Sequence, residues 1–347
     1  FEQEMGIEVV RPNIAGRMGA YGAAVYAKKK SKGKADSTLA NTEALKNFVH
    51  EIKNTNCGLC NNNCRLTINS FGGGRKFIAG NRCERPITKR VPSNDMNMYS
   101  YKLKLLDSYK PVEGVRGKLG IPMGLNMYEL YPFWYRFFTE LKFEVFKSPH
   151  SSRKLYQRGQ QTIPSDTVCF PAKLMHGHVQ TLIDRGAETI FYPCLTYNFD
   201  EHLGDNHYNC PVVAYYPEVL EDNCRELEGE TFLRPFIDLS HPDEFRKRFP
   251  AFIHEHWPKI EDEEIDAAIT AAYREYYKYM AETRAKGDEV IAEARKQGRH
   301  ILVLSGRPYH VDPEVNHGID RLITKMGAAV ITEDSISEKT GHMKTAV

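Results

Sequence analysis

The sequence has no long hydrophobic run and no excess of either charge. No apolar stretch approaches the roughly 20 residues that a membrane-spanning helix requires, so we expect no membrane partner. The 347 residues include 47 Lys and Arg against 45 Asp and Glu, a formal net charge of +2. A nucleic-acid binder would show a marked basic excess, and we therefore expect no nucleic-acid partner.

Cysteines are few, but they are clustered. Of the eight, four lie close together at Cys57, Cys60, Cys64 and Cys83. Residues 1–4 do not resemble a signal peptide, and disulfide scaffolds belong mainly to secreted proteins. The spacing is instead typical of metal ligation in a reducing compartment, so we expect a cytoplasmic protein. Hydrophobic residues make up 41% of the chain, which is enough for a sizeable core and excludes a disordered chain.

The clustered cysteines predict a small metal-binding hairpin module. Residues 65–71 alternate polar and apolar side chains, three glycines follow at 72–74, and residues 75–79 return, which is typical of a β-hairpin. A tight trio of thiolates and a fourth brought back by the hairpin can close a tetrahedral shell. The spacing fits zinc and equally fits a [4Fe-4S] cluster, so the identity of the metal stays open.

The chain divides into segments of different composition, and its ends suggest a piece of a larger protein. We expect the order to be a domain tail over 1–27, a basic linker over 28–40, the Cys-rich metal module over 41–90, a connector over 91–116, an α/β domain over 117–240, a helical segment over 241–298, and the start of a second α/β unit over 299–347. Two strands alone do not make a stable sheet, so we expect the second unit to be completed by further sequence or by neighbouring segments.

From residue 117 the pattern alternates strand and helix. This rhythm predicts a doubly wound parallel sheet of the flavodoxin or Rossmann kind. The predicted strands are 118–122, 143–146, 189–192 and 212–216, and the predicted helices are 126–141, 152–159 and 171–185. In the second unit, strands over 300–304 and 328–331 flank a helix over 314–326.

Two further cysteines are expected at one edge of this sheet. Cys169 precedes Pro171 at the start of a predicted helix, where the amide dipoles favour a thiolate. Cys194 follows the predicted strand 189–192. In a parallel sheet these two positions share the edge where ligands bind. Cys210 precedes the predicted strand 212–216 and is expected at the opposite edge, and Cys224 is expected to be structural.

A few polar residues near these positions are candidate ligand contacts. Lys173 and His176 share a polar face of the helix that follows Cys169, whereas His178 aligns with Leu174 and is expected to pack in the core. Arg307 lies between a predicted strand end and a predicted helix start, which suggests an anion site. The sequence identifies no catalytic residue.

Several separate blocks of residues resemble a known family. These are 120–129, 164–173 with His176-Gly177-His178, 192–194, 209–211, 307–310, 316–318 and 80–85. They resemble the large acyl-CoA dehydratase activases, which activate 2-hydroxyglutaryl-CoA dehydratase and benzoyl-CoA reductase systems. Residues 10–24 look like the last helix of an activator ATPase domain of the actin/hexokinase type. The chain would then join the ATPase domain to the dehydratase-like α/β region.

The resemblance implies an iron–sulfur electron-transfer system. In that family, ATP hydrolysis drives the transfer of a low-potential electron to a partner protein that holds an iron–sulfur cluster. This partner acts on a CoA thioester. Cys169 and Cys194 match positions that hold a cluster in the dehydratase-like subunits, which favours [4Fe-4S] over zinc. The ATPase phosphate-binding loops and a later cysteine ligand are absent from these residues. The resemblance therefore implies that the partners are activase ATPase and dehydratase-like domains or subunits. ATP would be bound only by those partners, and this segment would be inactive on its own. The alternative is a non-catalytic, zinc-stabilised scaffold that docks neighbouring domains.

Overall fold

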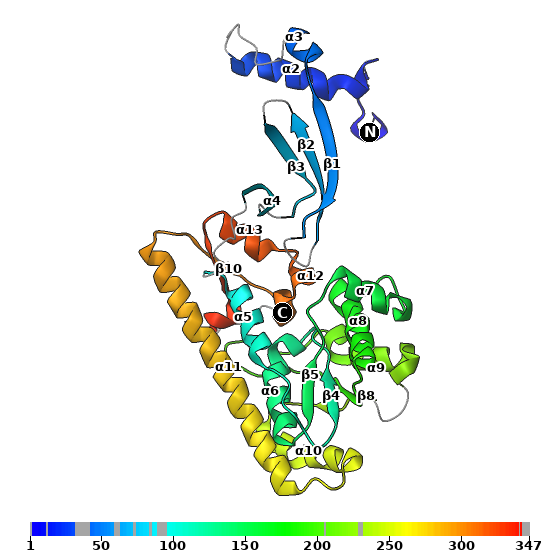
Figure 1. Cartoon of the computed structure of the whole chain (residues 1–347), viewed down its shortest axis with the longest axis vertical. Helices are drawn as coiled ribbons and strands as arrows, with labels where there is room; N and C mark the ends of the chain where they lie inside the picture. The colour runs from blue at the N-terminus through cyan, green and yellow to red at the C-terminus, as the bar shows by residue number, and fades with distance from the viewer. Residues whose placement is uncertain are drawn as a thin grey trace. The chain divides into compact units, whose positions relative to one another are not determined.

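A computed structural model describes most of the chain (Figure 1). The described residues are 2–11, 13–31, 42–58, 63–71, 74–82, 85–88, 96–204, 206–227, 232–339 and 341. The chain forms two compact units, residues 1–90 and 91–347. Each unit is described below by itself.

The first unit begins with helices. They are α1 (Glu2–Met5), the 3-10 helix η1 (Ala15–Arg17), α2 (Met18–Ser31) and α3 (Thr42–Lys46), with α4 (Arg85–Thr88) at its end. Helix α2 continues past the expected boundary at residue 27 to Ser31, so the basic stretch expected as a linker over 28–40 begins inside this helix. Three lysines in its last turn, Lys28–Lys30, suit that position because the C-terminal end of a helix carries partial negative charge.

The rest of the first unit is a three-stranded antiparallel sheet. Its strands are β1 (His50–Asn56), β2 (Arg65–Phe71) and β3 (Arg75–Ala79), in that order. The predicted hairpin over 65–79 is confirmed by the β2–β3 pairing. Strand β1 was not expected, because its sequence HEIKNTN is polar and almost wholly exposed, without apolar alternation.

The second unit is built on a four-stranded parallel sheet. Strands β4 (Lys118–Ile121), β5 (Glu144–Lys147), β6 (Thr189–Phe191) and β8 (Phe232–Leu233) are arranged in the order β5-β4-β6-β8. In chain order this is 2-1-3-4, the flavodoxin-like arrangement. The mixed α/β prediction with a parallel sheet is therefore confirmed.

Helices cover both faces of this sheet. They are α6 (Met127–Glu140), α7 (Arg153–Gly159), α8 (Phe170–Asp184) and α9 (Pro211–Asn223). Figure 1 shows α6 on one side together with α11 (Asp262–Lys296), and α7, α8 and α9 on the other. The predicted helices 126–141, 152–159 and 171–185 are thus present within two residues at each end.

The predicted strand over 212–216 is wrong. These residues lie in α9, whose N-cap is Cys210 and whose first residue is Pro211. The run Val212-Val213-Ala214-Tyr215-Tyr216 is rich in β-formers, but its buried members continue at helical spacing to Leu220. A proline at the first helical position favours the helix, and the packing surface of α9 outweighs the local propensity. The strand before α9 is β7 (Cys194–Leu195), and the strands after it are β8 and β9 (Phe236–Ile237); β7 and β9 pair in parallel.

An aromatic core lies between the sheet and the long helices. Phe133, Trp134, Phe137 and Phe138 of α6 are fully buried. Their rings contact Phe191 of β6 and the phenylalanines of α10 (Pro242–His256). Helix α11, which lies in the segment predicted to be helical over 241–298, is at the outside of the unit in Figure 1. It nevertheless buries one face along its length, because its apolar residues recur every three or four positions.

A second, two-stranded parallel sheet follows. Its strands are β10 (Ile301–Leu304) and β11 (Ala329–Thr332), as predicted within one residue. The intervening helix is split into α12 (Pro313–Asn316) and α13 (Ile319–Lys325) by the left-handed backbone of His317 and Gly318, at φ 55° and 77°. The remaining elements are α5 (Met98–Ser108), η2 (Gln160–Thr162), η3 (Arg225–Leu227), η4 (Pro308–Val311), η5 (Glu333–Ser335) and η6 (Ser337–Lys339). None of the helices in the described ranges has the length and apolar character needed to cross a bilayer.

Candidate functional site

The strand order places the topological switch point at the carboxyl ends of β4 and β6, where successive connections turn in opposite directions. Doubly wound sheets bind ligands in a crevice at this position. Cys194 lies just past β6, at the first position of β7. Its backbone N–H donates to the Pro235 carbonyl at 2.9 Å, and only 1% of its surface is exposed. Burial raises the pKa of its thiol to about 12, so the free protein holds Cys194 as a neutral thiol.

Cys169 and Cys210 occupy equivalent positions on two helices. Cys169 is the N-cap of α8 and Cys210 is the N-cap of α9, and each is followed by a proline in the first turn. The Cys210 sulfur accepts from the Val213 backbone N–H at 3.4 Å. Both cysteines are exposed. Helix N-termini favour thiolates, because unpaired N–H groups and the helix dipole stabilise negative charge.

The expected position of Cys210 at the opposite sheet edge is wrong. The neighbouring Asn209 donates its backbone N–H to Thr196 at 2.8 Å and its side-chain amide to the Leu195 carbonyl at 3.0 Å. These bonds hold the start of α9 beside β7. Cys210 therefore joins Cys169 and Cys194, and these three residues are called the cysteine edge below.

Tyr192 lies near the cysteine edge, two residues before Cys194. Burial raises the pKa of its phenol well above the usual value, and the thiols of Cys194, Cys169 and Cys210 add to the shift. All three sulfurs are therefore within electrostatic reach of this hydroxyl. The hydroxyl is buried and has no hydrogen-bond partner, which is unusual because buried polar groups are normally paired.

The thiols do not converge on one point. Within the described part of the chain, no three His, Cys, Asp or Glu side chains lie close enough together to hold a metal ion. The cysteine edge thus combines three thiols with a nearby phenol whose hydroxyl is buried and unpaired. Its sulfurs are not gathered into a metal-binding group.

The two polar candidates on α8 differ in accessibility. Lys173 is partly exposed, one turn after Cys169, and its Nζ donates to the Asp166 carbonyl at 2.7 Å. His176 is fully buried. Its Nδ1 lies 2.8 Å from the Thr162 hydroxyl and its Nε2 lies 2.9 Å from the Tyr216 hydroxyl. Burial lowers the pKa of His176 to about 4, so the ring is neutral and occupied by internal partners.

His178 and Cys224 are internal as well. The ring nitrogens of His178 lie 2.8 Å from the Ser148 hydroxyl and 2.9 Å from the Ser151 hydroxyl. Ser151 also donates to the buried carboxylate of Asp312. Cys224 is 3% exposed and caps the end of α9, with its sulfur 3.7 Å from His176. Neither residue faces the crevice with a free polar group.

Arg307 approaches the cysteine edge from the second sheet. It is exposed and is the N-cap of η4, and its backbone N–H donates to His310 Nδ1 at 2.9 Å. Burial raises the pKa of the Tyr309 phenol, Cys210 and Cys169 raise it further, and Arg307 lowers it. Arg307 and two members of the cysteine edge therefore lie within electrostatic range of the same phenol.

Sequence reasoning missed a buried polar network beside the crevice. Asn126 donates to the Asn198 side chain at 3.1 Å, and Asn198 donates to Glu129 at 3.4 Å. Tyr276 of α11 donates to the other Glu129 oxygen at 3.3 Å. Burial raises the pKa of Glu129 to about 7. Asn198 belongs to the polar residues 196–209 that follow Cys194, and only their position after a strand end could have indicated this role.

In the first unit, the strand register brings Cys57 and Cys64 together. The Cys57 N–H donates to the Cys64 carbonyl at 2.8 Å, directly beyond the Asn56–Arg65 pair that ends the β1–β2 ladder. Gly80 follows β3 with φ 83°, and a Cβ there would lie 2.3 Å from the Arg65 carbonyl. The chain therefore leaves β3 beside this same end of the sheet. Cys60 and Cys83, the other two predicted ligands, lie outside the described residues.

Comparison with known proteins gives one family match. Residues 118–336, more than half of the 347, match the family model described as the CoA enzyme activase uncharacterised domain. The match spans the three parallel sheets of the second unit and all three members of the cysteine edge. No curated protein and no solved structure matches the chain.

Proposed function

The chain belongs to the CoA enzyme activase family, and we propose that it is the electron-transferring segment of an ATP-dependent activator. The partner enzyme would be of the 2-hydroxyacyl-CoA dehydratase or benzoyl-CoA reductase type. ATP would be bound by activase domains or subunits other than this segment. The single observation that carries the proposal is that Cys169, Cys194 and Cys210 lie at two helix starts and one strand, all within electrostatic range of the unpaired hydroxyl of Tyr192.

These residues suit a [4Fe-4S] cluster, which when bound would supply one-electron transfer at low potential. Cys169, Cys194 and Cys210 would be its ligands. The proposal requires the exposed side chains of Cys169 and Cys210 to turn toward the buried Cys194. The first amides of α8 and α9 would stabilise the thiolates, and the Tyr192 hydroxyl would donate a hydrogen bond to sulfur. Such outer contacts tune the potential of clusters.

We further propose that Cys57, Cys60, Cys64 and Cys83 hold a second metal in the first unit. The β1–β2 register that joins Cys57 to Cys64 supports this reading. Four thiolates accept either a [4Fe-4S] cluster or zinc. Zinc here and no metal at the cysteine edge would correspond to the alternative function, a scaffold that docks neighbouring domains.

Lys173 and Arg307 are the groups we assign to contact with a CoA thioester or a partner. Both lie beside the cysteine edge, and both carry a fixed positive charge that suits phosphate groups. His176 would act differently, because its ring is buried and both of its nitrogens are hydrogen-bonded to hydroxyl groups inside the protein. It would position α8 through Thr162 and Tyr216 rather than touch a ligand.

Metal analysis tests the proposal. The full chain is purified without oxygen, reconstituted with iron and sulfide, and assayed for iron, sulfide and zinc per chain. We expect the double variant Cys169→Ser/Cys194→Ser to lose about four iron and four sulfide per chain, and Cys57→Ser/Cys64→Ser to keep that amount at the cysteine edge. One zinc per chain, unaffected by the first double variant and without iron, would support the scaffold instead.

A further inference from the structure

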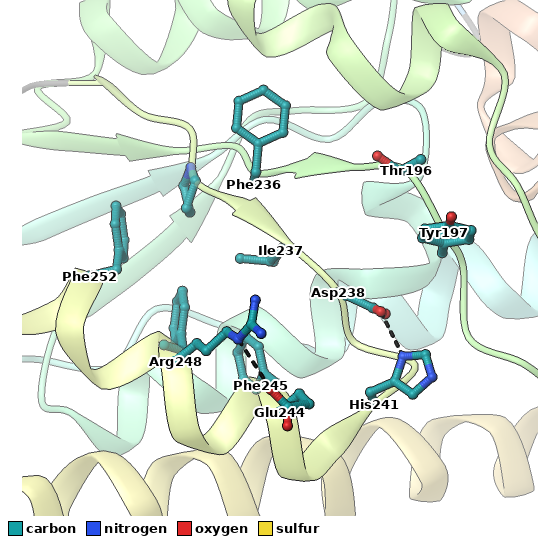
Figure 2. Close-up of a pocket in the computed structure, with 12 residues that line it drawn as sticks. Thr196, Tyr197, Phe236, Ile237, Asp238, His241, Glu244, Phe245, Arg248 and Phe252 are labelled. Carbon is teal, nitrogen blue, oxygen red and sulfur yellow. Dashed lines mark hydrogen bonds and ion pairs between the residues drawn. The ribbon is translucent and has the colours of Figure 1, made fainter.

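A cavity of about 540 Å³ opens next to the cysteine edge but contains none of its thiols. It lies between β9 and the first three turns of α10, with Thr196 and Tyr197 at one end (Figure 2). Its volume is within the range of small-molecule sites, which are mostly apolar with a few polar groups that fix the ligand's orientation.

Aromatic rings form one wall of the cavity. Phe245, Phe249 and Phe252 recur at helical spacing along α10, so their rings line up on one face. Phe245 and Phe249 stack at 4.5 Å and 24°, and Phe249 and Phe252 stack at 5.5 Å and 22°. Ile237 of β9 faces the cavity from the opposite side (Figure 2). A row of nearly parallel rings opposite an aliphatic side chain suits a flat apolar group.

Two ion pairs border this apolar wall. The Nδ1 of His241 lies 2.7 Å from Asp238, whose carboxylate also accepts the Ser240 N–H. These bonds lower the pKa of Asp238 against the effect of burial, which is the largest and raises it. The carboxylate is therefore ionised and already satisfied. The Asp238 carboxylate therefore needs no cationic ligand.

Arg248 is placed differently. Its Nε donates to Glu244 at 3.2 Å, and its side chain is 82% exposed. Figure 2 shows the other two guanidinium nitrogens turned toward the open centre of the cavity, below Ile237. A guanidinium offers paired N–H donors that match the two oxygens of a carboxylate. The cavity thus combines an aromatic wall with one available site for an oxyanion.

We propose that this cavity binds a small monocarboxylate with a flat apolar body. The body lies against Phe249 and Phe252, and the carboxylate pairs with the terminal nitrogens of Arg248. This site involves no thiol and no metal, so it stands independently of the proposed electron transfer.

Binding of 2-naphthoate to the full chain tests the proposal, with 2-naphthalenemethanol as the uncharged probe of the same shape. Both are followed by their fluorescence during titration. Because a charge-assisted pair at an exposed site adds modestly to affinity, we expect naphthoate to bind about tenfold more tightly than the alcohol. Equal affinities of the two probes, or no saturable binding of either, would overturn the proposal.

Matched variants assign the effect to Arg248. Arg248→Met keeps the stem of the side chain and should abolish the preference for naphthoate without changing alcohol binding. Arg246→Met is the control, because Arg246 lies on the same helix but pairs with Asp266 and Thr270 outside the cavity. Glu244→Gln should tighten naphthoate binding roughly two- to fivefold, since a competing exposed carboxylate is removed. An Arg248→Met chain that keeps the preference, or an Arg246→Met chain that loses it equally, would exclude the site.

Discussion

The imidazole Nε2 of His176 and the hydroxyl of Tyr216 lie 2.9 Å apart in the core, and they join helix α8 to helix α9. The first helix begins after Cys169 and the second after Cys210. The two rings are also edge to face, with centroids 5.6 Å apart. This contact therefore fixes the relative position of two helix N-termini that carry thiols.

Removal of the Tyr216 hydroxyl should weaken this link. Tyr216→Phe leaves the buried Nε2 of His176 without a partner, which costs roughly 1–2 kcal/mol of unfolding free energy. Denaturant unfolding measures the loss. The control is Tyr215→Phe on the same helix, since Tyr215 is 42% exposed and should change stability little. Equal effects of the two substitutions would contradict the role given to the contact.

The buried His178 should make the protein less stable in acid. Burial lowers its pKa to about 3, and nearby His150 adds to the shift. Below a pH near 6.5, the ordinary pKa of histidine, the unfolded chain binds a proton at His178 that the folded chain does not bind. The stability of the folded state therefore falls as the pH falls. Between pH 7 and pH 5 this group lowers the free energy of unfolding by about 2 kcal/mol.

His178→Gln cannot take up this proton. The stability difference between pH 7 and pH 5, measured by denaturant unfolding, should therefore shrink by about 2 kcal/mol in the variant. His300→Gln replaces a histidine that is exposed and should leave the difference unchanged. An unaltered pH dependence in His178→Gln would show that the ring is not held neutral by burial.

Glu129 should have the opposite pH dependence. Burial raises its pKa from 4.5 to about 7, so the folded protein keeps the proton that the unfolded chain releases. Its contribution to stability is favourable at low pH and is lost as the pH rises from about 4.5 to about 7. In Glu129→Gln, the decrease in melting temperature from pH 5 to pH 8 should be smaller than in the parent protein. A larger decrease would contradict this assignment.

Gly177 should tolerate no side chain. A Cβ at this position would lie 2.1 Å from the Leu155 carbonyl oxygen, because α7 and α8 approach closely there. Gly177→Ala must push the helices apart and should cost about 1–3 kcal/mol, the usual cost of overpacking. Gly204→Ala is the control, since a Cβ there meets nothing within 4 Å. Thermal unfolding of both variants distinguishes a packing requirement from a general effect of replacing glycine.

Strands β4, β5 and β6 of the parallel sheet were predictable because they alternate with periodic helices, whereas the two-residue strand β8 was not predicted. Cys169 and Cys194 could be placed at one edge for the same reason. Cys210 could not, because the β-branched and aromatic run after Pro211 favours a strand locally and only packing against β7 selects the helix. The proline directly after Cys210, as near Cys169, was the one available indication of a helix start.

Buried polar partners were also beyond the sequence. Glu129, Asn198 and Tyr276 come from distant segments and meet only in the folded unit. Strand β1 has no apolar alternation and pairs through its backbone. Hydrophobic periodicity detects surfaces that pack on a core, and neither of these features depends on such a surface.

The most direct measurement is the electron paramagnetic resonance spectrum of the dithionite-reduced, reconstituted chain carrying Cys57→Ser and Cys64→Ser. In this background only the cysteine edge can supply a cluster of the proposed kind. We expect a [4Fe-4S]⁺ signal that is lost when Cys210→Ser is added and retained when Cys224→Ala is added. Cys224 serves as the control because it is a buried cysteine of the same unit that lies outside the cysteine edge. The absence of any cluster signal, or equal loss with both additional substitutions, would contradict the assignment of the cysteine edge as the electron-transfer site.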